Sequence, residues 1–267
     1  MSNIKKKLEK PQYGWYVKNL VFGFTFVGLI GIALIIISLY RIGVWQVILF
    51  LGGIILIIIF LWPGIGLAMM NIILDSKDED ITESFTAINE NQNSKILDIG
   101  CGTGRTSLKV AKMLKNGGYL YGIDIYSKMA ISGNDLETVQ HNAELEGVAE
   151  KTSFKFGSAT EIPFDDESFD IVNVSSVLHE IHEKGGQMKA LNEIYRVLKP
   201  GGTAYIGEWN RYSFPLILYS GVFCIVFKPK QYWKKILEKS KLKLKEMENQ
   251  GGYILFTVQK YKVSPVL

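Results

Sequence analysis

Residues 96–104 read Ile-Leu-Asp-Ile-Gly-Cys-Gly-Thr-Gly, and this stretch decides the fold of the chain. Its apolar half predicts a buried strand, and glycine at every second position of the other half lets a turn lie flat against a ligand. Amide N–H groups of the turn then point at that ligand from the start of the next helix. Residues 105–115 predict that helix, because Leu108, Ala111 and Leu114 share one face.

A second strand is predicted over residues 119–124 and ends in Asp124, twenty residues after the third glycine. A mononucleotide-binding βαβ unit has an acid at this position, where it binds ribose hydroxyls. A dinucleotide-binding turn has its third glycine five residues after the first, but this chain has Arg105 there. The spacing therefore favours a single nucleoside, and a dinucleotide or nucleotide-sugar enzyme is the disfavoured alternative.

Three further segments follow the glycine turn: Gly157-Ser-Ala-x-x-Ile-Pro-Phe164, Phe169-Asp-Ile-Val-Asn-Val174 and Arg196-Val-Leu-Lys-Pro-Gly-Gly202. Together with Asp98-x-Gly100-x-Gly102-x-Gly104 they resemble the class I S-adenosylmethionine-dependent methyltransferases, over residues 93 to 260. The resemblance implies S-adenosylmethionine as the cofactor. It also implies a doubly wound α/β sheet of seven strands, mostly parallel, with the last strand antiparallel.

The alternation of strands and helices over residues 75–267 independently predicts such a doubly wound domain, with its core at 93–260. Asn249-Gln-Gly-Gly252 predicts a hairpin turn, so the seventh strand should run antiparallel. The predicted strands are 95–99, 119–124, 153–156, 169–175, 203–208, 242–248 and 253–259. The predicted helices begin at Thr106 and cover 135–146, 186–198 and 231–240, and residues 75–94 should supply a linker and a packing helix.

The resemblance assigns the glycine turn to the methionine part of the cofactor, which bare backbone can approach closely. The residues of this turn are Gly100, Cys101, Gly102, Thr103 and Gly104. Cys101 is expected to fill space rather than to act as a nucleophile. With only two cysteines, the chain predicts neither a disulfide framework nor a zinc site.

Side chains around the turn complete the expected cofactor site. Asp124 should accept hydrogen bonds from both ribose hydroxyls, and Ile125 should pack on the adenine. Asp98 either lies near the ammonium group of the cofactor or caps the N–H groups of the turn. Ser158 stands where many family members have an aspartate that binds the adenine amino group, which predicts a weaker or water-mediated contact. Two more positions of this site are Ala159, beside the adenine, and Ser175, at the end of the fourth strand.

The methyl acceptor should lie after the fourth strand, along the stretch Ser175-Ser-Val-Leu-His-Glu-Ile-His182. In the resembling family this stretch borders both the cofactor and the acceptor. His179 and His182 are the candidate catalytic residues, because they could share a helix face and an imidazole titrates near neutral pH. The alternative for His179 is a structural role in holding the loop. Paired carboxylates, a Ser-His-Asp order and metal-ligand spacing are all missing from the sequence, so no metal is expected.

The first 74 residues predict a membrane hairpin. Residues 20–40 and 42–62 carry no charge, with Arg41 alone between them. Each run spans roughly 30 Å as a helix, the thickness of a bilayer core. Five lysines precede the first run, so both termini and the catalytic domain of this two-span cell-membrane protein should be cytoplasmic. The alternatives are a cleaved signal peptide, which a second equal run argues against, and a buried helical pair of a soluble protein.

Two apolar segments adjoin the predicted spans. Pro63-Gly64 should end the second span, and residues 65–74 should form a short interfacial helix. The fourteen residues 214–227 carry no charge. As a helix they reach only about 21 Å, so they should dip into the membrane interface or form an apolar lid. The lysines that would then face lipid headgroups are Lys228, Lys230, Lys234 and Lys235. Burial in the domain core is the alternative.

These features predict a membrane-bound methyltransferase whose acceptor is a hydrophobic small molecule, such as a lipid headgroup, a quinone precursor or an apolar thiol. Its partners should be this acceptor and the lipid bilayer, whereas a net charge of +4 is too small to indicate nucleic acid. The element pattern and the Leu178-His179 pair most resemble the small-molecule methyltransferases that include quinone-biosynthesis enzymes. A non-catalytic membrane scaffold that senses the cofactor is the alternative, and the sequence specifies no oligomeric state. If the hairpin serves only as an anchor, the domain without residues 1–74 should keep its activity.

Overall fold

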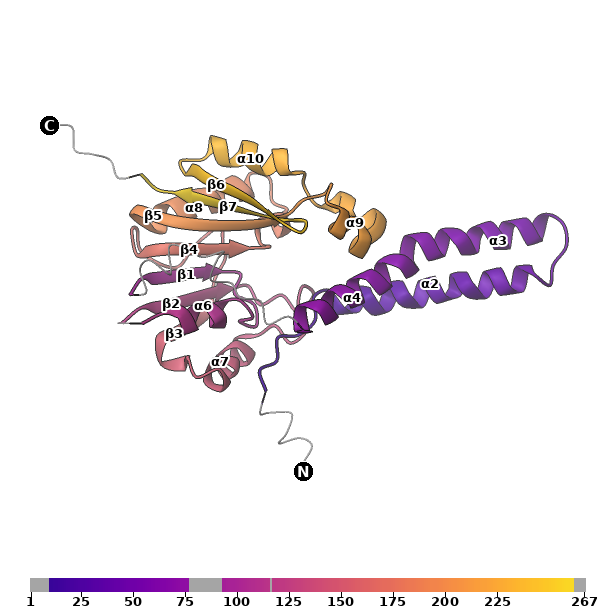
Figure 1. Cartoon of the computed structure of the whole chain (residues 1–267), viewed down its shortest axis with the longest axis horizontal. Coiled ribbons are helices and arrows are strands. Elements are labelled where there is room, and N and C mark those ends of the chain that lie inside the picture. The colour runs from indigo at the N-terminus through magenta and orange to yellow at the C-terminus, as the bar shows by residue number, and fades with distance from the viewer. Residues whose placement is uncertain (1–9, 77–92, 116, 262–267) are drawn as a thin grey trace, which may run out of the picture.

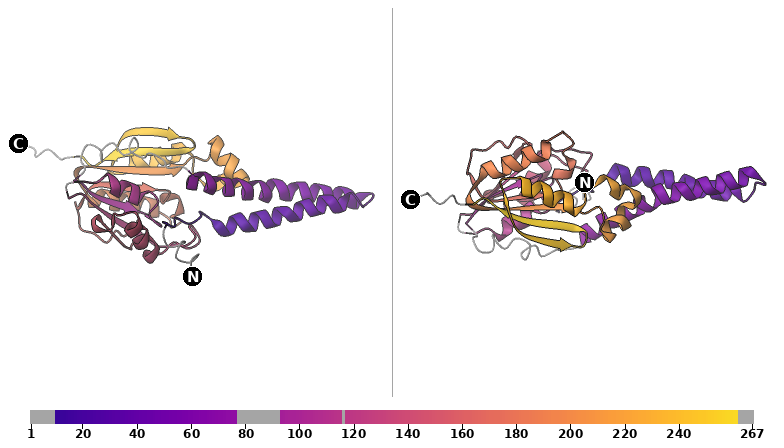
Figure 2. Two further views of the ribbon diagram at one scale, coloured as in Figure 1. Left: turned by 60° about the horizontal axis from the view of Figure 1, so that its bottom comes forward. Right: turned by 90° about the horizontal axis from the view of Figure 1, so that it is seen from above.

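The computed structural model describes residues 10–76, 93–115 and 117–261. They form a helical hairpin and a sheet domain, and the hairpin projects from one end of the sheet domain (Figure 1, Figure 2). The linker and helix expected over residues 75–94 lie outside the described residues except at their ends.

A seven-stranded sheet in the order β3-β2-β1-β4-β5-β7-β6 organises the domain. Neighbouring strands are parallel except that β7 is antiparallel to both β5 and β6, so the predicted reversed hairpin is confirmed. The winding reverses between β1 and β4, and ligands of such sheets bind at this point, outside the carboxyl ends of the strands. The strands are β1 (Lys95–Ile99), β2 (Tyr119–Asp124), β3 (Thr152–Phe156), β4 (Phe169–Ser175), β5 (Leu198–Trp209), β6 (Lys243–Gln250) and β7 (Tyr253–Gln259).

Helices cover both faces of the sheet, because its parallel strands are apolar on both sides. One face carries α6 (Ser107–Met113) and α7 (Leu136–Leu145), and the other carries α8 (Gly186–Val197) and α10 (Lys230–Lys239). In α8, Ala190, Leu191, Ile194 and Val197 recur at helical spacing, and all four are fully buried against the sheet. Two 3₁₀ turns, η3 (Ala149–Lys151) and η4 (Leu178–Glu180), lie before β3 and after β4.

The hairpin consists of α2 (Lys18–Ser38) and a second, continuous helix made of α3 (Val44–Leu56), the π-helical turn η1 (Ile57–Leu61) and α4 (Trp62–Ser76). The expectation that Pro63-Gly64 ends the second span is therefore wrong, and residues 65–74 extend the same helix. In η1 the Trp62 N–H donates to Ile57 O, five residues back. This wider turn gives the proline ring room where it would clash with regular α-helical bonding.

Small residues bring the two helices of the hairpin close together. A Cβ atom on Gly28 would lie 2.4 Å from Cβ of Leu61, and one on Gly31 would lie 2.8 Å from Gly53 O. Lys18–Ser38 and Val44–Leu74 are long and apolar enough to cross a membrane, each with a mean hydropathy of 2.8. Only 17% and 6% of these stretches are buried, so little of their surface is covered by the rest of the described chain.

The uncharged segment after β5 folds into α9 (Phe214–Ser220) and the 3₁₀ helix η5 (Gly221–Val226), which pack on the base of the hairpin. Trp62 Nε1 donates to Leu218 O at 2.8 Å, and the ring of Phe223 stacks on that of Phe24 at 4.6 Å. The expected alternative of burial in the domain core is wrong, because several of its side chains are widely exposed. They include Phe214 (74%), Ile225 (65%) and Val226 (65%).

Candidate functional site

The candidate site lies at the carboxyl ends of β1, β2 and β4, where the glycine turn leaves β1. Gly100, Gly102 and Gly104 have φ angles of 76°, 54° and 92°, a region that residues with side chains rarely adopt. The Gly100 N–H donates to Ile123 O of β2 at 2.7 Å, which pins the turn against the neighbouring strand. The turn therefore lies, without side chains at these three positions, where the winding of the sheet reverses. Neighbouring side chains pack closely on it, since a Cβ atom would lie 2.2 Å from Val177 Cγ2 at Gly100 and 2.9 Å from Ile131 Cδ1 at Gly102.

Asp124 closes this turn from the end of β2. Its Oδ2 accepts from the Gly102 N–H at 2.8 Å, and its Oδ1 accepts from the Tyr126 N–H at 2.5 Å. An ionised carboxylate has about four acceptor positions, so capacity remains for the donors of a ligand. Ile125 follows directly and is 57% exposed, which adds an uncovered apolar surface to the carboxylate.

Asn134 is a site residue that the sequence did not single out. Its Nδ2 donates to Asp124 Oδ1 at 3.4 Å and to Ser127 O at 3.3 Å. The side chain is buried, yet none of the described residues donates a hydrogen bond to its Oδ1. A buried amide oxygen without a donor costs roughly 1–3 kcal/mol. A ligand that brings a hydroxyl group beside Asp124 would satisfy this oxygen.

Asp98 is buried beneath the turn and bonded at both oxygens. Its Oδ1 accepts from Asn173 Nδ2 of β4 at 2.7 Å, and its Oδ2 accepts from the Ser107 hydroxyl of α6. Burial raises the pKa of Asp98 to about 6, against the opposing effect of these two hydrogen bonds. The alternative that Asp98 caps the N–H groups of the turn is wrong, because it ties β1 to β4 and α6 instead. A position beside the ammonium group of a cofactor stays a prediction.

The remaining predicted cofactor residues differ in their surroundings. Burial raises the pKa of the Cys101 thiol well above its ordinary value, which suits the expected packing role. Ser158 Oγ accepts from the Thr160 N–H at 3.2 Å, so part of its acceptor capacity is used within its own turn. Ala159 is buried in the core next to it. Ser175 at the end of β4 donates its hydroxyl to Asn173 Oδ1 at 3.2 Å.

His179 and Glu208 form a buried pair at the ends of β4 and β5. His179 Nδ1 lies 2.8 Å from Glu208 Oε2, and Nε2 lies 3.3 Å from Glu180 Oε1. Glu208 is fully buried, and its Oε1 accepts from the Leu178 N–H at 2.8 Å, which fastens η4 to β5. Burial opposes charge on His179, but the hydrogen bonds and charges of Glu180 and Glu208 outweigh it and raise its pKa to about 9. At neutral pH His179 is therefore a cation with both nitrogens occupied.

His182 does not share a helix face with His179, so this expectation is wrong. The 3₁₀ turn η4 ends at Glu180, and Ile181 is extended, with φ −84° and ψ 100°. The side chain of His182 lies exposed beyond it. A spacing of three residues aligns side chains only in a continuing helix, which is not formed here.

Aromatic rings lie between the His179–Glu208 pair and the segment formed by α9 and η5. The ring of Phe227 lies 5.1 Å from that of His179 and 6.4 Å from that of Trp209. Trp209 in turn lies 5.4 Å from Tyr253 of β7, whose hydroxyl is 3.4 Å from Ser176 Oγ. This series of ring contacts therefore connects the exposed apolar segment 214–226 with the end of β4.

Known proteins share the part of the chain that carries this site. Residues 97–206 match the family described as methyltransferase domain. The demethylmenaquinone methyltransferase of Lactiplantibacillus plantarum is 34% identical over 125 residues, which cover 47% of this chain and 49% of that protein. By the family match, residues 97–206 carry a methyltransferase domain.

Further proteins and solved structures are similar to this chain. The ubiquinone/menaquinone biosynthesis C-methyltransferase UbiE of Pectobacterium carotovorum is 31% identical over 120 residues, 45% of this chain and 44% of that protein. The chain spans about half the length of the curated relatives it matches. Among solved structures, a SAM-dependent methyltransferase from Aquifex aeolicus matches with a TM-score of 0.54 at 18% identity, over 70% of this chain and 96% of that chain. One from Methanosarcina mazei matches with a TM-score of 0.52 at 22% identity, over 64% of this chain and 94% of that chain.

The residues of the methyltransferase domain fit S-adenosylmethionine, the cofactor of this family. Asp124 keeps acceptor positions beyond its bond to the Gly102 N–H, and Asn134 Oδ1 has no donor among the residues that the structure describes, which suits binding of ribose hydroxyls. Exposed Ile125 offers a surface for the adenine.

Of the residues beyond the predicted set, Glu208 could have been found from the sequence, since it is an acid at the end of an apolar strand. Asn134 lies in a loop and gives no such signal. Within the described part of the chain, no three His, Cys, Asp or Glu side chains are grouped to hold a metal ion.

Proposed function

We propose that the chain transfers a methyl group from S-adenosylmethionine to a hydrophobic, quinone-like acceptor at the cytoplasmic surface of the cell membrane. The names of two relatives, demethylmenaquinone methyltransferase and UbiE, support a quinone-like acceptor, because these proteins are 34% and 31% identical to the chain over 125 and 120 residues. An acceptor of this kind has a polar ring that must reach the cofactor and an apolar part that favours lipid.

The observation that carries the proposal is the apolar connection between the hairpin and the acceptor side of the domain. Phe24 of the hairpin stacks on Phe223 of η5, and Phe227 directly after η5 lies 5.1 Å from His179. The outer side chains of α9 and η5 are exposed, which gives an apolar acceptor a surface leading from the hairpin toward β4. The hairpin would hold this surface at the membrane interface.

The charges next to the hairpin support a cytoplasmic domain. Lys10 and Lys18 flank the start of α2, and Lys5, Lys6 and Lys7 precede them in the sequence. The turn between the helices carries Arg41 alone. Positively charged flanks are retained in the cytoplasm, so both termini and the methyltransferase domain would lie on that side.

The residues of the site have separable roles in this reaction. When bound, S-adenosylmethionine supplies the electrophilic methyl group. Asp124 and Asn134 would hold its ribose, and the bare backbone at Gly102 would let its methionine part approach. Glu208 fastens η4 and orients His179, which would place this histidine next to the acceptor. We assign His179 a positioning role, because a cation with both ring nitrogens bonded is not available to accept a proton.

A methyl-transfer assay in lipid tests this function. The full chain in detergent or vesicles is supplied with S-adenosylmethionine labelled in its methyl group and with a panel of demethylated quinones, phospholipids and apolar thiols. Label should enter the organic-solvent extract in a quinone one methyl group heavier, and the variant Asp124→Asn should lose most of this signal. Cofactor binding without a labelled product from any member of the panel would contradict catalysis and favour the sensing scaffold.

A further inference from the structure

The segment that precedes α2 crosses the loops of the cofactor site. We call residues 12–17 the roof segment. The Thr103 hydroxyl of the glycine turn donates to Tyr13 O at 2.8 Å. Ser132 exchanges two hydrogen bonds with Trp15, from Trp15 N–H to its hydroxyl at 2.8 Å and from its own N–H to Trp15 O at 2.9 Å. The roof segment is therefore bonded both to the turn after β1 and to the loop after β2.

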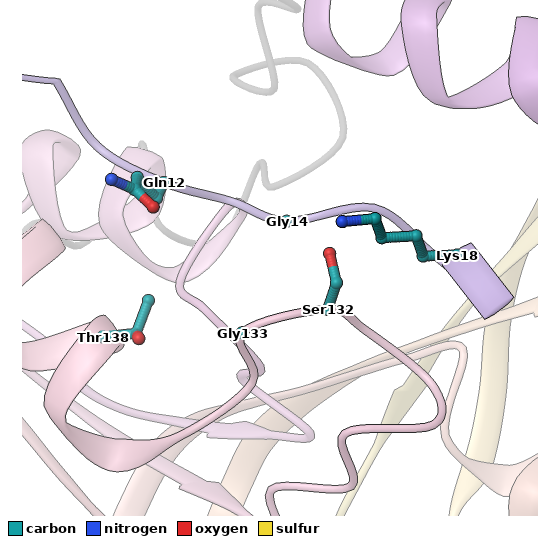
Figure 3. Close-up of a pocket in the computed structure, with 6 residues that line it drawn as sticks. All are labelled: Gln12, Gly14, Lys18, Ser132, Gly133 and Thr138. Carbon is teal, nitrogen blue, oxygen red and sulfur yellow. The ribbon is translucent and has the colours of Figure 1, made fainter. Parts of the chain in front are cut away.

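Gly14 allows the roof segment to lie directly on this loop. Figure 3 shows Gly14 beside Ser132 and Gly133. Gly14 has a φ of 64°, and a Cβ atom there would lie 2.0 Å from Ser132 O. No other residue fits without displacing backbone, so the close approach of the two segments is built into the sequence.

Tyr16 is the residue of the roof segment that bonds to the loop covering the glycine turn. It pairs as an antiparallel bridge with Ile131, whose Cδ1 lies 2.9 Å from where a Gly102 Cβ would be. Burial raises the pKa of Tyr16, and the charges of Asp98 and Asp124 raise it further while Arg105 lowers it. The phenol of Tyr16 is therefore close enough to Asp98 and Asp124 for their charges to raise its pKa.

The hairpin holds Tyr16 from the opposite side. Asn71 of α4 is 2% exposed, and its Oδ1 accepts from the Tyr16 N–H at 2.8 Å while its Nδ2 donates to Tyr16 O at 3.2 Å. Val17, which joins the roof segment to α2, has a φ of 45°. A β-branched residue adopts this strained conformation only where its surroundings enforce it. The second helix of the hairpin therefore fixes the backbone of Tyr16 over the site.

We propose that the roof segment closes the S-adenosylmethionine site, that Tyr16 contacts the bound cofactor, and that α4 keeps this contact in register through Asn71. The inference rests on the proposed function, because it takes the glycine turn and Asp124 as the cofactor site. It makes the hairpin a structural part of that site rather than an anchor alone. Removal of residues 1–74 would then remove part of the cofactor site itself.

Calorimetric titration of S-adenosylhomocysteine into the full chain in detergent tests whether the roof segment contributes to cofactor binding. Tyr16→Ala and Gly14→Ala should weaken binding by about fivefold to thirtyfold, the loss expected when a site contact worth 1–2 kcal/mol is removed. Asn71→Leu, which leaves every site side chain unchanged, should weaken binding by about threefold to tenfold. Tyr212→Ala is the matched control, because Tyr212 is 69% exposed, and its affinity should equal that of the wild type.

Two further measurements separate a local effect from misfolding. Tyr16→Phe keeps the ring, so weaker binding with an unchanged unfolding midpoint assigns the contact to the hydroxyl. Hydrogen exchange of residues 12–17 in the wild type should slow when S-adenosylhomocysteine is added. The role of the roof segment is refuted if Tyr16→Phe, Asn71→Leu and Gly14→Ala bind S-adenosylhomocysteine as tightly as the wild type and hydrogen exchange is unchanged. The proposed function would still stand in that case. If the wild type binds no S-adenosylhomocysteine, the proposed function fails as well.

Discussion

His179 is predicted to make the stability of the domain depend on pH. Its pKa is about 9 in the folded chain, compared with 6.5 for an unperturbed histidine. This difference in pKa contributes about 3 kcal/mol to the free energy of unfolding. The side chain of His179 is only 13% exposed and that of Glu208 is buried, so solvent screens this pair little. Glu180 is 59% exposed, so solvent screens its contribution more strongly. Because the folded chain has the higher pKa, this stability is fully present below pH 6.5 and is lost as the pH rises through 9.

Replacement of His179 by glutamine removes the titrating group but keeps a side chain that can reach Glu208. The difference in free energy of unfolding between the wild type and His179→Gln should therefore shrink by about 3 kcal/mol as the pH rises through this range. For a chain of this size, 1 kcal/mol corresponds to about 2–4 °C in unfolding midpoint. The two midpoints should thus converge by about 6–12 °C.

Thermal unfolding of the detergent-solubilised chain, followed by fluorescence at a series of pH values, measures this convergence. His141→Gln is the matched control, because the side chain of His141 is 44% exposed, and its midpoint should follow that of the wild type at every pH. A constant difference between the wild type and His179→Gln would refute the buried cation. His179 would then return to the candidates for a general base.

Three other perturbations test separate parts of the account. Asp124→Asn should weaken S-adenosylhomocysteine binding roughly tenfold to a hundredfold in calorimetry, since a charge-assisted hydrogen bond contributes about 1.5–3 kcal/mol; unchanged affinity would argue against ribose binding there. The chain should stay in the membrane pellet during an alkaline carbonate wash, and complete release would contradict an inserted hairpin. Trp62→Phe removes the 2.8 Å bond to Leu218 O and should speed hydrogen exchange in residues 214–226, whereas unchanged exchange would show that α4 does not hold α9.

The sheet was predictable because its information is local. The bounds of β1, β2, β4 and β7 are those expected from the apolar runs and the turns that follow them. The second helix of the hairpin was predicted, but its continuation past residue 63 was not, because Pro63-Gly64 indicates a break. The π-helical turn that accommodates the ring depends on the bonding of residues 57–62 and has no signature in the order of the side chains.

The site was predictable only where its residues follow strands in sequence. The glycine turn comes directly after β1, and Asp124 is the last residue of β2. Their positions therefore follow from the order of the elements. Asn71 and Tyr16 are 55 residues apart, and Trp15 and Ser132 are 117 apart. Contacts over such separations leave no periodic pattern. The carboxylate partner of His179 left no pattern for the same reason, since Glu208 reaches it from the next strand of the sheet.

Competitive equilibrium dialysis of the full chain against S-adenosylhomocysteine and NADH tests the central claim most directly. The turn with Arg105 in place of a third dinucleotide glycine, and the acceptors Asp124 and Asn134, predict saturable binding of the single nucleoside and none of the dinucleotide. Retention of NADH, or of neither compound by folded protein, would contradict the account.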